Sequence, residues 1–105
     1  MNDCIFCQIR DGKIPAKFVY QDDDVMVFPD IHPASPIHWL IVPKKHVSEV
    51  LFLEDAALEN KLFRIIQKMI KQAELTDKGY KIVINGGGLQ DVDHLHIHLR
   101  GPIAR

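Results

Sequence analysis

Three histidines alternate with apolar residues near the end of the chain, at His94, His96 and His98. Side chains on a β-strand point alternately to opposite faces, so a strand over this segment places the three imidazoles on one face. Neighbouring imidazoles then stand about 6.6–6.8 Å apart along the strand, within reach of one phosphate-sized group. The residues between and after them share the opposite face and suit a hydrophobic core: Leu95, Ile97 and Leu99.

Near neutral pH, an imidazole can act as a nucleophile, a general base, a hydrogen-bond donor or a metal ligand. A hydrolytic metal site recruits a carboxylate or further imidazoles close to such an array. Here Arg100, Gly101 and Pro102 follow instead, and the Arg100 guanidinium would repel a cation. The pattern therefore favours a nucleophile with supporting imidazoles, whereas His94 stays open as a ligand for a different centre.

The composition is that of an ordinary globular chain. With 105 residues, 47% hydrophobic and 26% charged, residues 1–105 are expected to form a single domain with a modest core. The net charge is −1 and there is no long basic run, so we expect neither nucleic acid nor a membrane surface as a partner. No apolar run approaches the roughly 18 residues of a membrane span, and no signal-peptide pattern precedes Cys4, so we expect a cytoplasmic protein.

Hydrophobic periodicity predicts an α+β fold. Apolar residues recur every three or four positions over 54–74, which indicates one long amphipathic helix. A short helical turn is expected over 4–10. Strands are expected over residues 18–20, 25–28, 38–42, 80–84 and 94–99, with the third stopped by Pro43 and glycines 86–88 between the last two. Hairpins with one long helix imply a five-stranded antiparallel sheet that carries the helix on one face.

The run over 94–99 resembles the signature of the histidine triad family, in which three histidines alternate with apolar residues. Further blocks match in the same order: Gly-Lys-Ile-Pro-Ala-Lys at 12–17, Asp-Ile-His-Pro at 30–33, the segment 36–46, Gly79-Tyr80 and Asn-Gly-Gly at 85–87. Together they cover almost the whole chain. They are similar to the Hint-like branch, the histidine triad nucleotide-binding proteins.

The resemblance implies a homodimer whose two five-stranded sheets join, and hydrolysis at the α-phosphorus of a nucleotide derivative. By analogy His96 attacks phosphorus, and water then opens the resulting nucleotidyl-histidine. One imidazole nitrogen must be free to attack, so the other needs an acceptor, which we expect to be a backbone carbonyl on the same strand. His98 would donate to a phosphoryl oxygen where charge grows in the transition state, and His38 on a neighbouring strand would support the array.

Nucleotide-binding residues are carried over from the resemblance position by position. The apolar slot for a purine base would consist of Ile5, Phe6, Ile9, Phe28, Ile31 and Leu40, although each could equally be core packing. Asp30 would hold the ribose hydroxyls or serve only as a turn former. Asn85, Gln90 and the glycine loop match the phosphate side. Asp91 stands where relatives carry a small hydroxyl residue, and its carboxylate would repel phosphate oxygens unless it turns away or meets an ammonium.

Two cysteines, Cys4 and Cys7, have the two-residue spacer of a zinc knuckle. A redox pair is less favoured, because that motif normally opens a helix after a strand and no strand is expected before residue 4; inert thiols are the third alternative. With His46 and His94, the pair resembles the Cys₂His₂ structural zinc site of some bacterial triad proteins and of the related uridylyltransferases. Such a zinc would stabilise the fold, and no metal would be required for the chemistry.

Three classes of function follow. The first is a hydrolase of purine nucleoside phosphoramidates such as adenosine 5′-phosphoramidate. The second is a dinucleoside polyphosphate hydrolase or nucleotidyltransferase that uses the same covalent step, although the long insertions of uridylyltransferases are absent. The third is a nucleotide-binding interaction protein with vestigial activity. The presence of His96 favours the first two.

Overall fold

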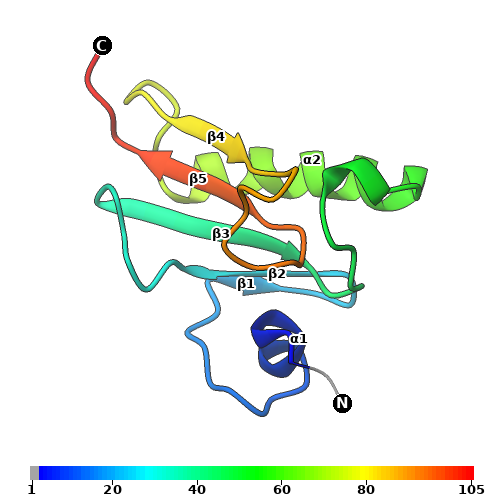
Figure 1. Cartoon of the computed structure of the whole chain (residues 1–105). Helices are drawn as coiled ribbons and strands as arrows, with labels where there is room; N and C mark the ends of the chain where they lie inside the picture. Colours follow the sequence, from blue (N-terminus) through cyan, green and yellow to red (C-terminus); the bar gives the residue numbers. More distant parts are fainter. Residues whose placement is uncertain (1–2) are drawn as a thin grey trace.

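Residues 3–105 are described by a computed structural model, in which one antiparallel sheet lies between two helices (Figure 1). The sheet has the strand order β1-β2-β3-β5-β4. Its strands are β1 (Tyr20–Gln21), β2 (Val25–Pro29), β3 (Ile37–Pro43), β4 (Lys81–Ile84) and β5 (Ile97–Gly101). The helices are α1 (Ile5–Arg10), α2 (Ala56–Gln72) and the short 3₁₀ helix η1 (Val50–Phe52). The predicted α+β fold, with five antiparallel strands, one long helix and a short N-terminal helical turn, is confirmed.

Helix α2 covers one face of the sheet. Asp55 caps its first turn by accepting a hydrogen bond from the Leu58 N–H at 3.0 Å. The buried stripe of the helix consists of Leu58, Leu62, Ile65, Ile66 and Met69. This stripe packs on Val25, Val27 and Ile41 and on the three apolar residues of the histidine run, Leu95, Ile97 and Leu99. The predicted core face of that run is therefore confirmed.

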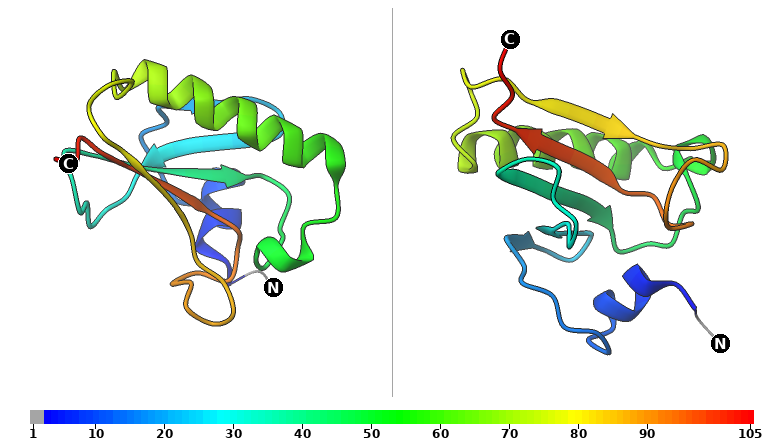
Figure 2. Two further views of the ribbon diagram at one scale, coloured as in Figure 1. Left: turned by 90° about the horizontal axis from the view of Figure 1, so that it is seen from above. Right: turned by 60° about the vertical axis from the view of Figure 1, so that its left-hand side comes forward.

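Helix α1 lies on the opposite face of the sheet, where a second and smaller core forms (Figures 1 and 2). Its buried members are Phe6 and Ile9 from α1 together with Met26, Phe28, Leu40 and Val42 from β2 and β3. Arg10 fixes the end of the helix, because its guanidinium donates to the Lys44 carbonyl at 2.9 Å. Neither α-helix within residues 3–105 has both the length and the apolar character that a membrane span requires.

Most element boundaries agree with the sequence to within two residues, but the triad strand does not. The sequence placed it over 94–99, whereas β5 covers Ile97–Gly101. The pairing with β3 stops at Ile41↔Ile97, and the Leu95 N–H instead donates to the Val47 carbonyl at 2.6 Å. His94 and His96 therefore precede the strand. The first strand is also shorter than predicted, although the Val19 N–H still donates to the Val27 carbonyl at 2.8 Å.

The register of the strands determines which side chains meet on the face opposite α2. Two rows of directly paired residues cross this face. The first row is Phe28, Leu40, His98 and Val83, and the second is His38, Arg100 and Lys81. The sheet thus brings two imidazoles and two cationic side chains together from three strands, beside the smaller core under α1.

Gly79, just before β4, offers a test of the fold. It has a φ of 77°, and a Cβ added there would lie 1.9 Å from the Ile103 carbonyl oxygen. Gly79→Ala should therefore lower the free energy of unfolding by at least about 3 kcal/mol, as measured by urea denaturation. Gly12→Ala is the matched control, with a φ of 76° and no atom within 4 Å of the added Cβ. It should cost only about 1–2 kcal/mol, and equal losses in the two variants would contradict the proposed backbone clash.

Candidate active site and metal-binding group

His96 is buried immediately before β5, and its ring has one defined hydrogen bond. Its Nδ1 lies 2.8 Å from the backbone carbonyl oxygen of His94. Because a carbonyl only accepts, Nδ1 carries the proton and donates, which leaves the lone pair of Nε2 free. The expected backbone acceptor is present, although it precedes the strand. A neutral imidazole held in this tautomer can act as a nucleophile at Nε2.

His38 and His98 form a chain of hydrogen bonds that begins at the backbone. The Ala34 N–H donates to His38 Nδ1 at 2.9 Å, and His38 Nε2 lies 2.8 Å from His98 Nδ1. A backbone N–H can only donate, so the proton of His38 is on Nε2 and is donated to His98. The proton of His98 is then on Nε2, which is buried and has no hydrogen-bond partner within residues 3–105. His98 therefore offers a free donor, with its ring centroid 5.0 Å from that of His96.

Both members of this pair are electrically neutral at pH 7. Burial lowers the pKa of His38 and of His98 below the usual 6.5, and the charge of Arg100 lowers both further. Asp30 opposes this shift, since its Oδ2 lies 3.5 Å from His38 Nε2 and 3.9 Å from His98 Nδ1. Burial is the larger effect, so His98 acts as an uncharged donor.

The structure brings together four of the six apolar residues predicted for the base slot. Phe6, Ile9, Phe28 and Leu40 are buried in the core under α1. Phe6 also reaches the triad, with its ring centroid 5.2 Å from that of His96 in an edge-on arrangement. The other two residues lie outside this core cluster and are exposed, Ile5 at 41% and Ile31 at 83%. Ring contacts therefore connect Phe28 through Phe6 to His96.

The predicted phosphate-side residues lie in the loop between β4 and β5. Gln90 holds this loop together: its side-chain oxygen accepts from the Gly88 N–H at 2.9 Å, and its nitrogen donates to Asp93 at 3.2 Å. Glu49 also binds the loop by accepting from the Gly87 N–H at 3.1 Å. Asn85 is half-buried and Asp91 is exposed. Their roles toward a nucleotide stay predictions.

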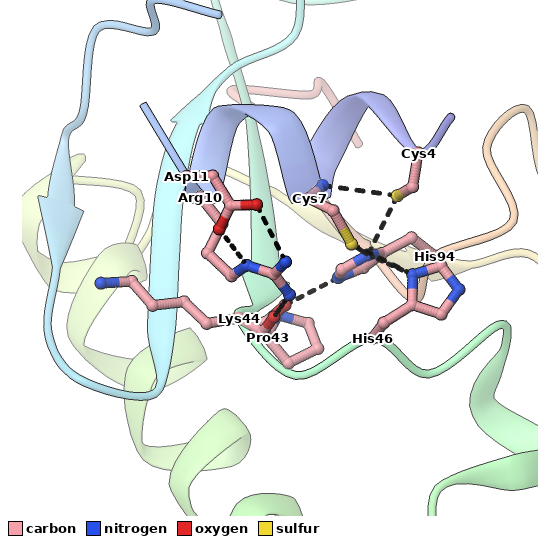
Figure 3. A network of polar contacts seen from close by, with 8 residues as sticks. All are labelled: Cys4, Cys7, Arg10, Asp11, Pro43, Lys44, His46 and His94. Carbon is pink, nitrogen blue, oxygen red and sulfur yellow. Dashed lines mark hydrogen bonds and ion pairs between the residues drawn. The ribbon is translucent and has the colours of Figure 1, made fainter. Parts of the chain in front are cut away.

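The four predicted metal ligands meet at one point (Figure 3). Cys4 Sγ lies 3.3 Å from His94 Nδ1, and Cys7 Sγ lies 3.3 Å from His46 Nδ1 and 3.6 Å from His94 Nδ1. The two Nδ1 atoms are 3.1 Å apart. The four residues could therefore hold a single metal ion between the start of α1, the loop after β3 and the segment before β5.

A backbone group sets the tautomer of His94. Its Nε2 lies 2.7 Å from the Pro43 carbonyl oxygen, to which it must donate. Nδ1 therefore keeps its lone pair and faces the cysteines (Figure 3). Burial lowers the pKa of His94 to about 4, so the imidazole is neutral at pH 7.

A second group of possible ligand atoms, from Asp30, His38 and His98, also lies within 4.8 Å. Its hydrogen bonds argue against a metal ion there. His38 Nε2 must carry a proton, because His38 Nδ1 accepts from the Ala34 N–H. A protonated nitrogen offers no lone pair to a metal, so this group is suited to hydrogen bonding instead.

Comparison with known proteins agrees with this geometry. The HIT domain family model matches residues 11–102. The chain belongs to the HIT family. It is 42% identical to Protein HitA of Neisseria gonorrhoeae, in an alignment that covers 96% of this chain and 97% of that protein. It is 41% identical to an uncharacterised HIT-like protein of Methanocaldococcus jannaschii, over 91% of this chain and 76% of the relative.

Solved HIT structures also superpose closely on this chain. A HIT family hydrolase from Legionella pneumophila is 37% identical, with a TM-score of 0.89 over 97% of this chain and 95% of that one. A HIT family hydrolase from Clostridium thermocellum is 33% identical, with a TM-score of 0.91 over 98% and 93% of the two chains. The resemblance to the histidine triad family is therefore confirmed.

Four contributions to this HIT site were not identified from the sequence. The Ala34 N–H and the Pro43 carbonyl set the tautomers of His38 and His94, but backbone groups leave no residue-type signal. Glu49, which binds the glycine loop, lies 38 residues from Gly87 in the chain. Arg100 was considered only as a charge that repels cations, whereas its register places it beside His98 and His38.

The lowered pKa values of His38 and His98 predict how stability depends on pH. The unfolded chain takes up protons on imidazoles near pH 6.5, whereas the folded protein resists protonation of these two. Their contribution to stability is therefore present above about pH 6.5 and is lost as the pH falls below that value. The free energy of unfolding should decrease between about pH 7 and pH 5, as measured by denaturation of metal-loaded protein.

His98→Asn should make this pH dependence shallower, because the amide oxygen can still accept from His38 but does not titrate. His32→Asn, at an exposed histidine outside the hydrogen-bond chain, is the control and should keep the wild-type slope. A His98→Asn slope equal to that of the wild type would contradict the assignment.

Proposed function

We propose that this HIT protein hydrolyses purine nucleoside phosphoramidates, such as adenosine 5′-phosphoramidate, at the α-phosphorus. The observation that carries the proposal is the free Nε2 of His96 beside the free Nε2–H of His98. The relatives named HIT family hydrolases, from Legionella pneumophila and Clostridium thermocellum, support the hydrolase class. Hydrogen bonds hold both imidazoles in fixed tautomers, His96 through the His94 carbonyl and His98 through His38, as attack at phosphorus requires.

The reaction would proceed in two displacements. In the first, His96 Nε2 forms a bond to the α-phosphorus and the bond from phosphorus to the amine breaks, so that the amine leaves and takes up a proton. In the second, water attacks phosphorus and releases the nucleoside monophosphate and neutral His96. His98 Nε2–H would donate to a phosphoryl oxygen, on which negative charge increases in both transition states.

The nucleoside would lie beside α1, against the apolar cluster that contains Phe6 and Phe28. The rings of Phe6 and Phe28 pack edge-on there, with centroids 5.7 Å apart, and could accept a purine by shape and stacking. Asp30 uses one oxygen to accept from the His32 N–H at 2.8 Å, which is the turn role considered from the sequence. Its other oxygen would be available to the ribose hydroxyls, so the two roles are compatible.

The alternatives differ in the leaving group or in the need for turnover. A dinucleoside polyphosphate hydrolase or nucleotidyltransferase would use the same covalent step at His96. A nucleotide-binding interaction protein would bind nucleotide without needing the free Nε2 of His96. Comparing turnover of adenosine phosphoramidate with that of a diadenosine polyphosphate separates the first two, and absence of turnover on both with retained binding identifies the third.

Replacing His96 tests the proposed nucleophile. His96→Ala should abolish hydrolysis of adenosine phosphoramidate, because the covalent path is lost. Binding of adenosine monophosphate, measured by calorimetry, should stay nearly unchanged, since the proposed base and ribose contacts lie elsewhere. Residual activity within tenfold of the wild type would rule out His96 as the nucleophile.

The metal group is proposed to bind one structural zinc ion through Cys4, Cys7, His46 and His94. Tetrahedral zinc with Zn–S of about 2.3 Å and Zn–N of about 2.0–2.1 Å places its ligand atoms about 3.3–3.8 Å apart. The observed separations of 3.1 to 3.6 Å are close to these values. Zinc bound there would stabilise the junction of α1 with the triad segment, and the proposed chemistry uses no metal.

Metal analysis tests this site. Protein purified without chelator should contain one zinc per chain, and Cys4→Ser combined with Cys7→Ser should contain none. Removal of zinc should lower the free energy of unfolding by several kcal/mol, because binding to a structural site contributes directly to folding. Zinc that survives the double substitution would show that these thiols are not the ligands.

The assembly and location also follow as proposals. Strand β4 is an edge of the sheet, and Tyr80, Ile82 and Ile84 on and beside it are exposed at 37% to 42%. Pairing of two β4 edges would cover these apolar residues and satisfy the free backbone groups, which supports the homodimer with joined sheets. Thiolate ligands require a reducing compartment, which supports a cytoplasmic location. We propose that residues 1–105 form a single domain.

A further inference from the structure

Arg100 lies two residues after His98 on β5, and none of the proposed roles uses its side chain. Register pairs it with His38 on β3 and with Lys81 on β4. Because residues two apart on a strand share a face, its side chain leaves the sheet on the same side as His98. Arg100, one of the two cations in the row His38, Arg100 and Lys81, is therefore next to the free donor of His98.

The Nε atom of Arg100 is removed from water, and no hydrogen bond within residues 3–105 compensates for this desolvation. The same condition holds for Nε2 of His98, two residues earlier. Buried donors without partners are costly, so an acceptor that reached them would be bound favourably. Two such donors, at His98 and Arg100 on the same face of β5, indicate a ligand that carries two neighbouring acceptor groups.

The charges around Arg100 define the kind of ligand. Arg100 is close enough to lower the pKa of both His38 and His98. The carboxylate nearest to that pair is Asp30, which is engaged by the His32 N–H and lies on the His38 side. Lys81 adds a second, exposed cation to the row of Arg100. This end of the site therefore favours an anion.

We propose that Arg100 binds a second phosphate, the one attached to the α-phosphate that His98 contacts. The inference rests on the proposed function, which places the α-phosphate beside His96 and His98. Ligands of this class are nucleoside diphosphates and the diphosphate portion of longer phosphate chains. A planar guanidinium suits phosphate because it can offer two parallel N–H donors. Arg100 thereby extends the site and makes the second phosphate a determinant of affinity.

Calorimetric binding of two ligands tests this role without turnover: adenosine monophosphate and the non-hydrolysable α,β-methylene adenosine diphosphate. The wild type should bind the diphosphate analogue at least about tenfold more tightly, as expected for one charge-assisted hydrogen-bonded contact. In Arg100→Gln the ratio of the two affinities should fall to about one, with monophosphate affinity unchanged. Arg100→Lys keeps the charge without the fork and should give an intermediate ratio.

Arg64→Gln is the matched control, since it removes the same charge from the exposed surface of α2 and should preserve the wild-type ratio. Equal wild-type affinity for the two ligands overturns the role of Arg100 while leaving the proposed function in place. Loss of both affinities in parallel in Arg100→Gln also overturns it. Failure of the wild type to bind either ligand overturns the proposed function itself.

Discussion

Backbone hydrogen bonds that permit only one tautomer are the constraint on which the site depends. The carbonyls of Pro43 and His94 require a proton on the nitrogen that faces them, and the Ala34 N–H requires a lone pair. Which nitrogen of each imidazole is free is therefore decided by the path of the main chain. The side chains need no charged partner to be oriented, so they can stay neutral and buried.

His94 belongs to the proposed metal group and also contacts His96, the proposed nucleophile. Its imidazole lies among Cys4, Cys7 and His46, while its carbonyl accepts from His96 Nδ1. Anything that shifts the imidazole of His94 therefore shifts the acceptor on which the tautomer of His96 depends. Phe6 strengthens this connection, because its ring packs edge-on against both imidazoles, at 5.7 Å and 5.2 Å between centroids.

Sequence reasoning succeeded where side-chain type carries the information. Alternation predicted which face of the histidine run is core, and residue type predicted that Cys4, Cys7, His46 and His94 come together, because each depends on residues visible in the sequence. The boundary of β5 was wrong because the Val47 carbonyl, 48 residues before Leu95, takes the N–H that a longer strand would pair. The Pro43 and Ala34 contacts were missed for the same reason, since any residue can supply a backbone group. Tertiary proximity, rather than residue type, decided these details.

The fixed tautomers also limit what His98 can do in catalysis. If His98 gave its Nε2 proton to a leaving group, its Nδ1 would need a replacement proton to remain a neutral imidazole. Within residues 3–105, the proton that faces Nδ1 belongs to His38 Nε2, 2.8 Å away. His38 cannot take another on Nδ1, because the Ala34 N–H occupies that lone pair. Transfer along the pair would leave His38 as an anion, which its buried position disfavours. His98 is therefore suited to stabilise negative charge on a phosphoryl oxygen by hydrogen bonding, and the proton for a leaving group must come from elsewhere.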